Sequence, residues 1–134
     1  MGTPTGPQSR AGAAGTFCWL DLAASDLDAA QQFYRRVFGW NFRAQPALGG
    51  VFTRAALDGR DLAVSLYPLR RAQLEQGVPS HWTPYVQVPD VEVAVRGAQA
   101  AGGRTVIAPL EIPGIARIAV VQDAVGALVG LWQA

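Results

Sequence analysis

The stretch from Phe17 to Trp40, FCWLDLAASDLDAAQQFYRRVFGW, decides how the rest of the chain is interpreted. Residues 17–23 alternate with the two-residue period of a strand that has two distinct faces. Ser25 or Asp26 then stands where a helix N-cap is expected, and Gly39 stands where left-handed backbone commonly ends a helix. Between these signals apolar residues recur at helical spacing. The stretch therefore predicts a strand followed by a capped helix that lays one apolar stripe on a sheet.

The same order of signals returns in the second half of the chain. Adding 64 to Asp26 gives Asp90, and adding 64 to Gly39 gives Gly103, so the distance from cap to stop is equal in the two halves. Each helix is followed by β-prone runs, and Asp58-Gly59 is a strong hairpin signal. The pattern predicts a second helix at 91–101 and the following strands: 40–45, 51–57, 62–67, 82–88, 105–107, 115–122 and 127–132.

The chain length of 134 residues favours a single domain. Residues 1–15 are rich in Gly, Pro and other small residues and are interpreted as a disordered tail. A charged segment bounded by prolines, 68–80, has the composition of an exposed connector with at most one helical turn. The interpretation is thus one domain over 16–134, built from modules at 16–67 and 81–134.

Composition excludes several classes of function. The net charge is +1, which gives no electrostatic basis for binding nucleic acid or an anionic membrane. All 11 basic residues are Arg, so a Schiff-base lysine is excluded. The lone Cys18 makes no intrachain disulfide, no run is apolar enough to span a membrane or to serve as a signal peptide, and a cytoplasmic location is expected. The two Gly-Gly pairs lack a phosphate-binding pattern, so nucleotides are not favoured.

Several short motifs resemble those of one known family. They are Phe33-Tyr34, Phe38-Gly39-Trp40, His81-Trp82, Pro84-Tyr85-Val86, Asp90-Val91, Gly102-Gly103, Ile112-Pro113-Gly114, Arg117 and 123–126. With the repeated strand and helix order, the chain resembles the vicinal oxygen chelate superfamily, which includes glyoxalase I, bleomycin-resistance proteins and extradiol dioxygenases. The resemblance implies an α+β fold. In this fold two βαβββ modules form a half-open, curved, eight-stranded mixed sheet around one pocket, with the helices outside.

The resemblance also implies where a metal ion would be bound. Family ligands lie in the first and fourth strands of each module and are normally His, Gln or Glu. The matching positions here are Trp19, Ser65, Thr83 and Gly130. None of these is a usual metal ligand, and a catalytic divalent metal needs at least three converging donors. We therefore expect no metal site and no cofactor.

Strand parity, with the pocket position that the family implies, predicts which residues line the pocket. They are Trp19, Asp21, Ser65, Tyr67, Thr83, Tyr85, Gln87, Arg117 and Trp132. This mixture of aromatic and hydrogen-bonding groups suits a small, partly planar organic ligand. Two alternatives stay open: Trp19 either stacks on a ligand or fills the cavity, and Arg117 either forms a structural ion pair, with Asp21 as the expected partner, or contacts a ligand.

The remaining reactive side chains give no clear catalytic assignment. Cys18 is interpreted as a buried, unreactive thiol, and His81 as a capping or packing residue with no partner acid near it in sequence. The first hypothesis is metal-independent binding of a small, partly aromatic molecule. The alternatives are a glyoxalase-like lyase or isomerase that uses Asp21, His81 or Glu111 for proton transfer, a dioxygenase or other metal enzyme with an unforeseen site, and a partner-binding domain. The family resemblance also allows a homodimer.

Overall fold

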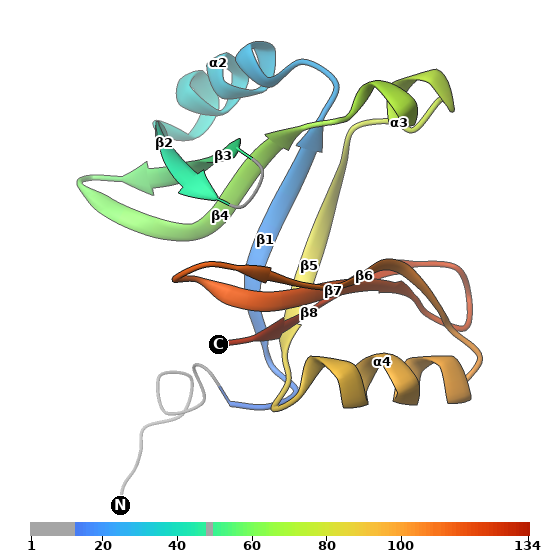
Figure 1. Cartoon of the computed structure of the whole chain (residues 1–134). Coiled ribbons are helices and arrows are strands. Elements are labelled where there is room, and N and C mark those ends of the chain that lie inside the picture. The colour runs from blue at the N-terminus through green and yellow to red at the C-terminus, as the bar shows by residue number, and fades with distance from the viewer. Residues whose placement is uncertain (1–12, 48–49) are drawn as a thin grey trace, which may run out of the picture. The chain divides into compact units, whose positions relative to one another are not determined.

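The structure is a computed structural model that describes residues 13–47 and 50–134. Most of the predicted tail, residues 1–12, therefore lies outside the described residues, as does part of the segment between the strands predicted at 40–45 and 51–57. Figure 1 shows the elements in chain order. They are β1 (Phe17–Ala24), α2 (Leu27–Phe38), β2 (Asn41–Ala47), β3 (Gly50–Leu57), β4 (Arg60–Pro68), α3 (Arg71–Glu75), β5 (His81–Gln87), α4 (Val91–Ala100), β6 (Arg104–Ile112), β7 (Ala116–Gln122) and β8 (Leu128–Gln133).

The strands form one eight-stranded mixed sheet in the order β2-β3-β4-β1-β5-β8-β7-β6. β1 pairs with β4 and β5 pairs with β8 in parallel, whereas β2 with β3, β3 with β4, β6 with β7 and β7 with β8 are antiparallel. Parallel pairs need a long crossover, which here contains the helix and two strands of each module. This topology confirms the predicted α+β class and its two βαβββ modules.

The residues gather into two compact units that divide strands β1 and β5. One unit is Leu20–Thr83, and the other combines residues 13–19 with Pro84–Ala134. We call the second the C-terminal unit. The first residues of β1 therefore belong to the C-terminal unit, and the first residues of β5 belong to the Leu20–Thr83 unit.

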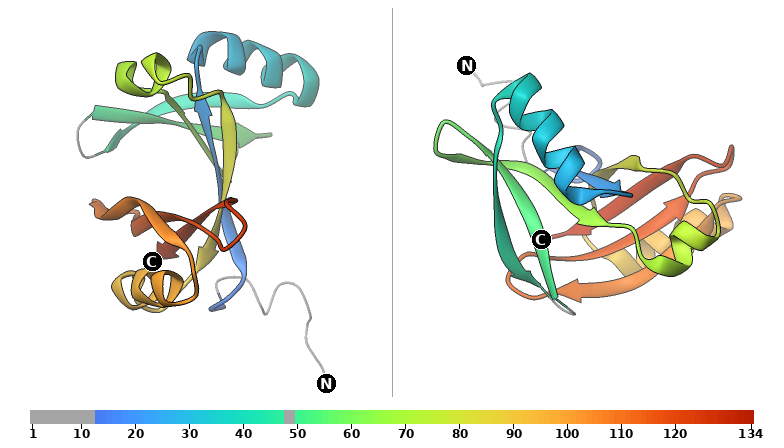
Figure 2. Two further views of the ribbon diagram at one scale, coloured as in Figure 1. Left: turned by 90° about the vertical axis from the view of Figure 1, so that its right-hand side faces the viewer. Right: turned by 90° about the horizontal axis from the view of Figure 1, so that it is seen from above.

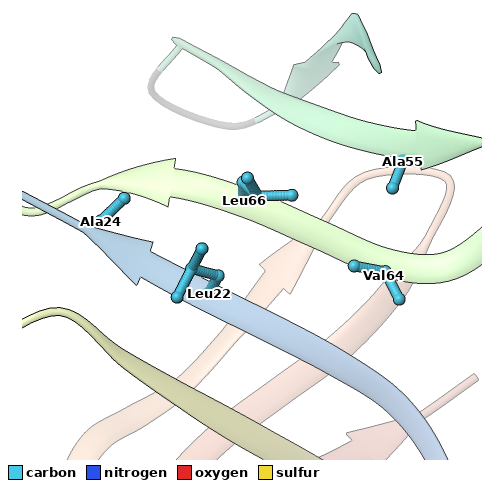
Figure 3. Packing of buried hydrophobic residues seen from close by; sticks show 5 residues of the cluster. All are labelled: Leu22, Ala24, Ala55, Val64 and Leu66. Atoms are coloured by element: carbon cyan, nitrogen blue, oxygen red, sulfur yellow. The ribbon is translucent and has the colours of Figure 1, made fainter. Parts of the chain in front are cut away.

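In the Leu20–Thr83 unit, one sheet face packs under α2. The buried residues of this face come from three strands, as Figure 3 shows: Leu22, Ala24, Ala55, Val64 and Leu66. The Asp26 carboxylate accepts a hydrogen bond from the Ala29 backbone N–H at 3.0 Å, and Gly39 has φ 73°. The predicted helix, its cap and its glycine stop are therefore confirmed.

In the C-terminal unit, α4 covers one face of β7 and β8, and Figure 2 gives two further views of it. Val91 and Val95 of α4 pack against buried Ala119, Val121 and Leu131. The Asp90 carboxylate caps the helix by accepting from the Val93 N–H. The strand predicted at 105–107 is too short, because β6 continues to Ile112 through an irregular register around Pro109. Proline is tolerated there because β6 is an edge strand.

Candidate functional site

A polar row crosses three strands of the Leu20–Thr83 unit. Asp21 of β1 lies opposite Ser65 of β4, and Ser65 lies opposite Arg54 of β3. Residues directly opposite each other in a sheet project from the same face, and alternate residues project from opposite faces. Because Leu22 and Leu66 pack under α2, the polar row lies on the face that α2 does not cover.

Two hydrogen bonds hold the polar side chains of this row in place. The Ser65 hydroxyl donates to the Asp21 carboxylate with 2.9 Å between the two oxygens, and Ser65 is buried. The half-buried Arg54 donates from Nε to the Leu62 carbonyl oxygen at 3.1 Å. The row thus places a carboxylate, a hydroxyl and a guanidinium on one sheet face.

Tyr67 adds a phenol to the same face, because it stands two residues after Ser65 on β4. The pKa of Tyr67 is raised to about 12, mainly by burial and also by the negative charge of Asp21, while the positive charge of Arg70 opposes the shift. The phenol therefore stays protonated at neutral pH and can donate a hydrogen bond beside the Asp21 acceptor.

This coupling predicts a measurable titration. We expect ultraviolet titration of the three tyrosines to show one step at about pH 12, and the Tyr67→Phe variant to lose that step. Asp21→Asn should move the same step to lower pH, because it removes a negative charge that disfavours the phenolate. Because the pKa of Tyr67 is raised in the folded state, its protonated phenol favours folding. This contribution to the free energy of unfolding is complete below the pKa that Tyr67 has in the unfolded chain, and it declines as pH rises through about 12. An Asp21→Asn variant with an unmoved step would contradict the proximity of these two groups.

Three of the predicted ligand residues come together in the C-terminal unit instead. The Trp19 and Trp132 rings stack with centroids 4.7 Å apart, and Tyr85 meets Trp132 edge-on at 5.9 Å. Tyr85 and Trp132 are buried, and Trp19 packs partly buried against them. This packing favours the alternative in which Trp19 fills space over the one in which it stacks on a ligand.

The two modules use the same register with different chemistry. Tyr85 lies opposite Gly130, just as Asp21 lies opposite Ser65, and Tyr85 stands 64 residues after Asp21. A Cβ on Gly130 would lie 2.2 Å from the Tyr85 ring. The first module thus has a hydrogen-bonded polar pair where the second has an aromatic ring lying on a glycine.

Arg117 does not pair with Asp21, and that prediction is wrong. Its guanidinium forms an ion pair with Glu92 of α4, donating from both Nε and Nη2, and lies 3.9 Å from a Glu111 oxygen. Hydrogen bonding to Glu92 raises the pKa of Arg117, and the same bond lowers the pKa of Glu92. The expectation of a structural ion pair is confirmed with a different partner. Strand parity shows only that Arg117 and Ala119 share one face of β7. The structure shows that this is the face covered by α4, because Ala119 packs under that helix.

The structure also gives the surroundings of the remaining candidate residues. Thr83 is buried in the Leu20–Thr83 unit, and Gln87 of the C-terminal unit donates to the Val88 carbonyl at 3.4 Å. Burial raises the pKa of the Cys18 thiol, which donates to the Tyr85 carbonyl at 3.7 Å and fits the unreactive interpretation. His81 donates from Nδ1 to the Pro79 carbonyl at 2.8 Å, which is the expected capping or packing contact.

The residues at the family's metal positions do not fit a metal ion. Trp19 stacks on Trp132, Gly130 has no side chain, Ser65 donates to Asp21, and Thr83 is buried. Across residues 13–47 and 50–134, no three His, Cys, Asp or Glu side chains gather closely enough to hold one.

Arg54 is the residue of the polar row that the sequence reasoning missed. Its signal in the sequence is an arginine within a mostly apolar strand, VFTRAAL. The sequence alone does not show which residue lies opposite Arg54 on the neighbouring strand. The pairing of β3 with β4 places Arg54 opposite Ser65.

Comparison with known proteins agrees with the fold. Residues 16–51 match the family model described as bleomycin resistance protein-like N-terminal. The methylmalonyl-CoA epimerase of Mycobacterium tuberculosis superposes with a TM-score of 0.60 and 20% identity, over 89% of this chain and 87% of that one. A Bacillus halodurans protein, BH1468, superposes with a TM-score of 0.64 and 14% identity, over 90% and 94%. The chain belongs to the vicinal oxygen chelate superfamily, the fold family of glyoxalases and bleomycin-resistance proteins.

The curated relatives are longer proteins. "Putative glyoxylase CFP32" of Mycobacterium bovis is 36% identical over 122 residues, which are 90% of this chain and 46% of the relative. "Anthracycline biosynthesis protein DnrV" of Streptomyces peucetius is 29% identical over 132 residues, again 90% of this chain and 48% of the relative. The chain spans about half the length of the curated relatives it matches.

The part of the chain that the structure describes contains no helix of the length and apolarity that crossing a membrane requires.

Proposed function

We propose that the chain binds a small, partly aromatic organic molecule without a metal ion, through the polar face of the Leu20–Thr83 unit. One observation carries this proposal: the Ser65 hydroxyl is committed to Asp21 beside the protonated Tyr67, on the sheet face opposite α2. Asp21 is half-buried on this face, and a carboxylate has about four acceptor lone pairs. It can therefore accept hydrogen bonds from a ligand as well as from Ser65.

The groups on this face define the ligand's chemistry. A carboxylate accepts from ligand hydroxyl or amine groups, the Tyr67 phenol donates to a ligand oxygen, and its ring offers an apolar surface. The likeness to a protein named for anthracycline biosynthesis supports a planar, hydroxylated aromatic compound as the class to test. The single thiol, Cys18, supports a cytoplasmic location for this binding.

Titration with daunorubicin, an intrinsically fluorescent anthracycline, tests the proposal directly. We expect saturable quenching with a dissociation constant in the micromolar range, unchanged by EDTA. Asp21→Asn should weaken binding by about tenfold or more, because a hydrogen bond to a charged group contributes roughly 1.5–3 kcal/mol. Asp61→Asn is the matched control, since Asp61 is an exposed carboxylate of the same unit that pairs with Arg43. It should leave the affinity unchanged.

Three results would count against this function. Equal weakening by the Asp21 and Asp61 variants would mean that the polar row does not bind the probe. Loss of binding in EDTA, or stoichiometric metal in the purified protein, would contradict metal independence. Absence of quenching by wild-type protein would reject this ligand class.

A lyase or isomerase reaction is the second candidate, favoured by the name of the 36% identical relative. In that case Asp21 would accept a proton from the substrate and Tyr67 would donate one to a developing oxyanion. Incubation with methylglyoxal and glutathione distinguishes this case, because turnover that Asp21→Asn abolishes would favour an enzyme over a binding protein.

A further inference from the structure

A second row of residues runs beside the polar row in the Leu20–Thr83 unit. Gln45 of β2 lies opposite Phe52 of β3. Phe52 comes level with Tyr67 of β4, because the antiparallel pairing of β3 with β4 continues one step beyond Thr53 and Leu66. We call Gln45, Phe52 and Tyr67 the second row.

The register also shows which face of the sheet this row occupies. Arg43 lies opposite Arg54, so both project from the face of the polar row. Gln45 stands two residues after Arg43. Phe52 stands two residues before Arg54. Because alternate residues of a strand share a face, the second row also lies on the face that α2 does not cover.

The side-chain oxygen of Gln45 is buried without a hydrogen-bond partner. Among the side chains that the structure describes, no other buried nitrogen or oxygen atom lacks one. An unpaired acceptor disfavours folding, because it loses its hydrogen bonds to water and gains none from the protein. Gln45 as a whole is only half-buried and stands on the edge strand β2, so rotation of its long side chain can turn the oxygen toward a ligand. A ligand donor would then restore the missing hydrogen bond.

We propose that Gln45 is a second hydrogen-bond acceptor for the ligand, and that the ligand is a flat, fused aromatic compound with donors at two opposite ends. One donor bonds to the Asp21 carboxylate and the other to the Gln45 side-chain oxygen. Between them the rings lie along Phe52, whose half-buried side chain offers an apolar surface. This inference rests on the proposed function and narrows the class of ligand.

The separation of the two acceptors sets the size of the ligand. Asp21 and Gln45 are three strands apart in the order β1-β4-β3-β2, and they lie in neighbouring rows. With strands about 4.8 Å apart and rows about 7 Å apart, their Cα atoms are roughly 16 Å apart along the sheet. A hydrogen bond covers about 3 Å at each end, and the two side chains cover part of the remainder. Two or three fused rings therefore bridge the acceptors, whereas a single ring is too short.

Two bicyclic probes that differ in one donor test the role of Gln45. The diol 2,6-dihydroxynaphthalene has a hydroxyl at both ends, whereas 6-methoxy-2-naphthol has at one end a methoxy group that cannot donate. We expect the single hydroxyl of the second probe to bind Asp21, because a charged acceptor forms the stronger hydrogen bond, so that its methoxy group faces Gln45. Isothermal titration calorimetry of the wild-type protein should show about tenfold tighter binding of the diol.

Gln45→Met should abolish this preference and leave the affinity for the methoxy probe unchanged, because methionine keeps the length of the side chain and removes the amide oxygen. The matched control is Gln32→Met, on an exposed glutamine of α2, which should keep the tenfold preference. Equal binding of the two probes by wild type, a preference that survives Gln45→Met, or one that Gln32→Met also abolishes would each overturn the inference. If daunorubicin still binds in a way that depends on Asp21, the proposed function stands without it. Failure of all three compounds to bind would reject both.

The stability of the ligand-free protein gives a second readout. Gln45→Met should raise the urea midpoint of unfolding, because it removes an acceptor that is buried without a donor. Gln32→Met should leave the midpoint unchanged. Higher stability together with loss of the diol preference is expected of a residue kept for binding, whereas a residue kept for folding would show the opposite change in stability. A lower midpoint for Gln45→Met would therefore contradict the inference.

Discussion

Gly130→Ala should destabilise the protein by about 3 kcal/mol, at the upper end of what overpacking costs a well-packed core. A Cβ at this position would lie 2.2–2.5 Å from three atoms of the Tyr85 ring. The ring cannot easily move aside, since Tyr85 is only 4% exposed and is held edge-on against Trp132. Chemical denaturation monitored by tryptophan fluorescence measures the loss.

Two further variants show whether the ring is the cause. Gly97→Ala is the matched control, because no described atom other than its own helix backbone and chain neighbours lies within 4 Å of a Cβ there. That substitution should stabilise α4 by roughly 0.5–1 kcal/mol. In a Tyr85→Leu background the cost of Gly130→Ala should fall strongly, since the flat ring is gone. If Gly130→Ala lowers the free energy of unfolding equally in both backgrounds, contact with the Tyr85 ring is not the reason that glycine is needed at this position.

Leu66→Ala should destabilise the protein by about 3 kcal/mol, as for other fully buried leucines. Leu66 is 0% exposed and lies with Leu22 and Val64 in the cluster under α2, as Figure 3 shows. Truncation leaves a cavity that strands on both sides of β4 cannot readily close. The free energy of unfolding measures this effect in the same assay.

Leu20→Ala provides the comparison within the same unit. Leu20 is 45% exposed, so its truncation should cost well under about 1 kcal/mol. Leu20 shares the face of Leu22 by strand parity, yet it is exposed. Equal losses for Leu20→Ala and Leu66→Ala would show that the packing under α2 differs from the one described.

Local signals were sufficient for most of the secondary structure. Asp26 and Asp90 cap their helices as predicted, and Asp58-Gly59 forms the hairpin turn with φ values of 52° and 77°. These features depend on residues within a few positions of each other, so a single sequence contains the information needed. The strand predicted at 105–107 is shorter than β6, because a proline such as Pro109 commonly marks the end of a strand. Pairing with β7 extends the strand past Pro109.

Local sequence signals could not predict which candidate residues lie together in the structure. Parity correctly separates the two faces of β4, which is why Ser65 and Tyr67 were assigned together. Arg117 was misassigned because its partner, Glu92, lies 25 residues away on a helix whose orientation sets which face of β7 is covered. Arg54 was missed because its relation to Ser65 is a matter of register between strands.

Local periodicity alone indicates the order of strands and capped helices in both modules, and the family resemblance adds the positions at which usual metal ligands are lacking. Tertiary packing was needed to show that Asp21 accepts from Ser65, that Trp19 stacks on Trp132, and that Phe33 is left exposed. The physical reason is that strand register and the rotation of a helix on its sheet are set by packing between residues distant in the chain, which no short stretch specifies.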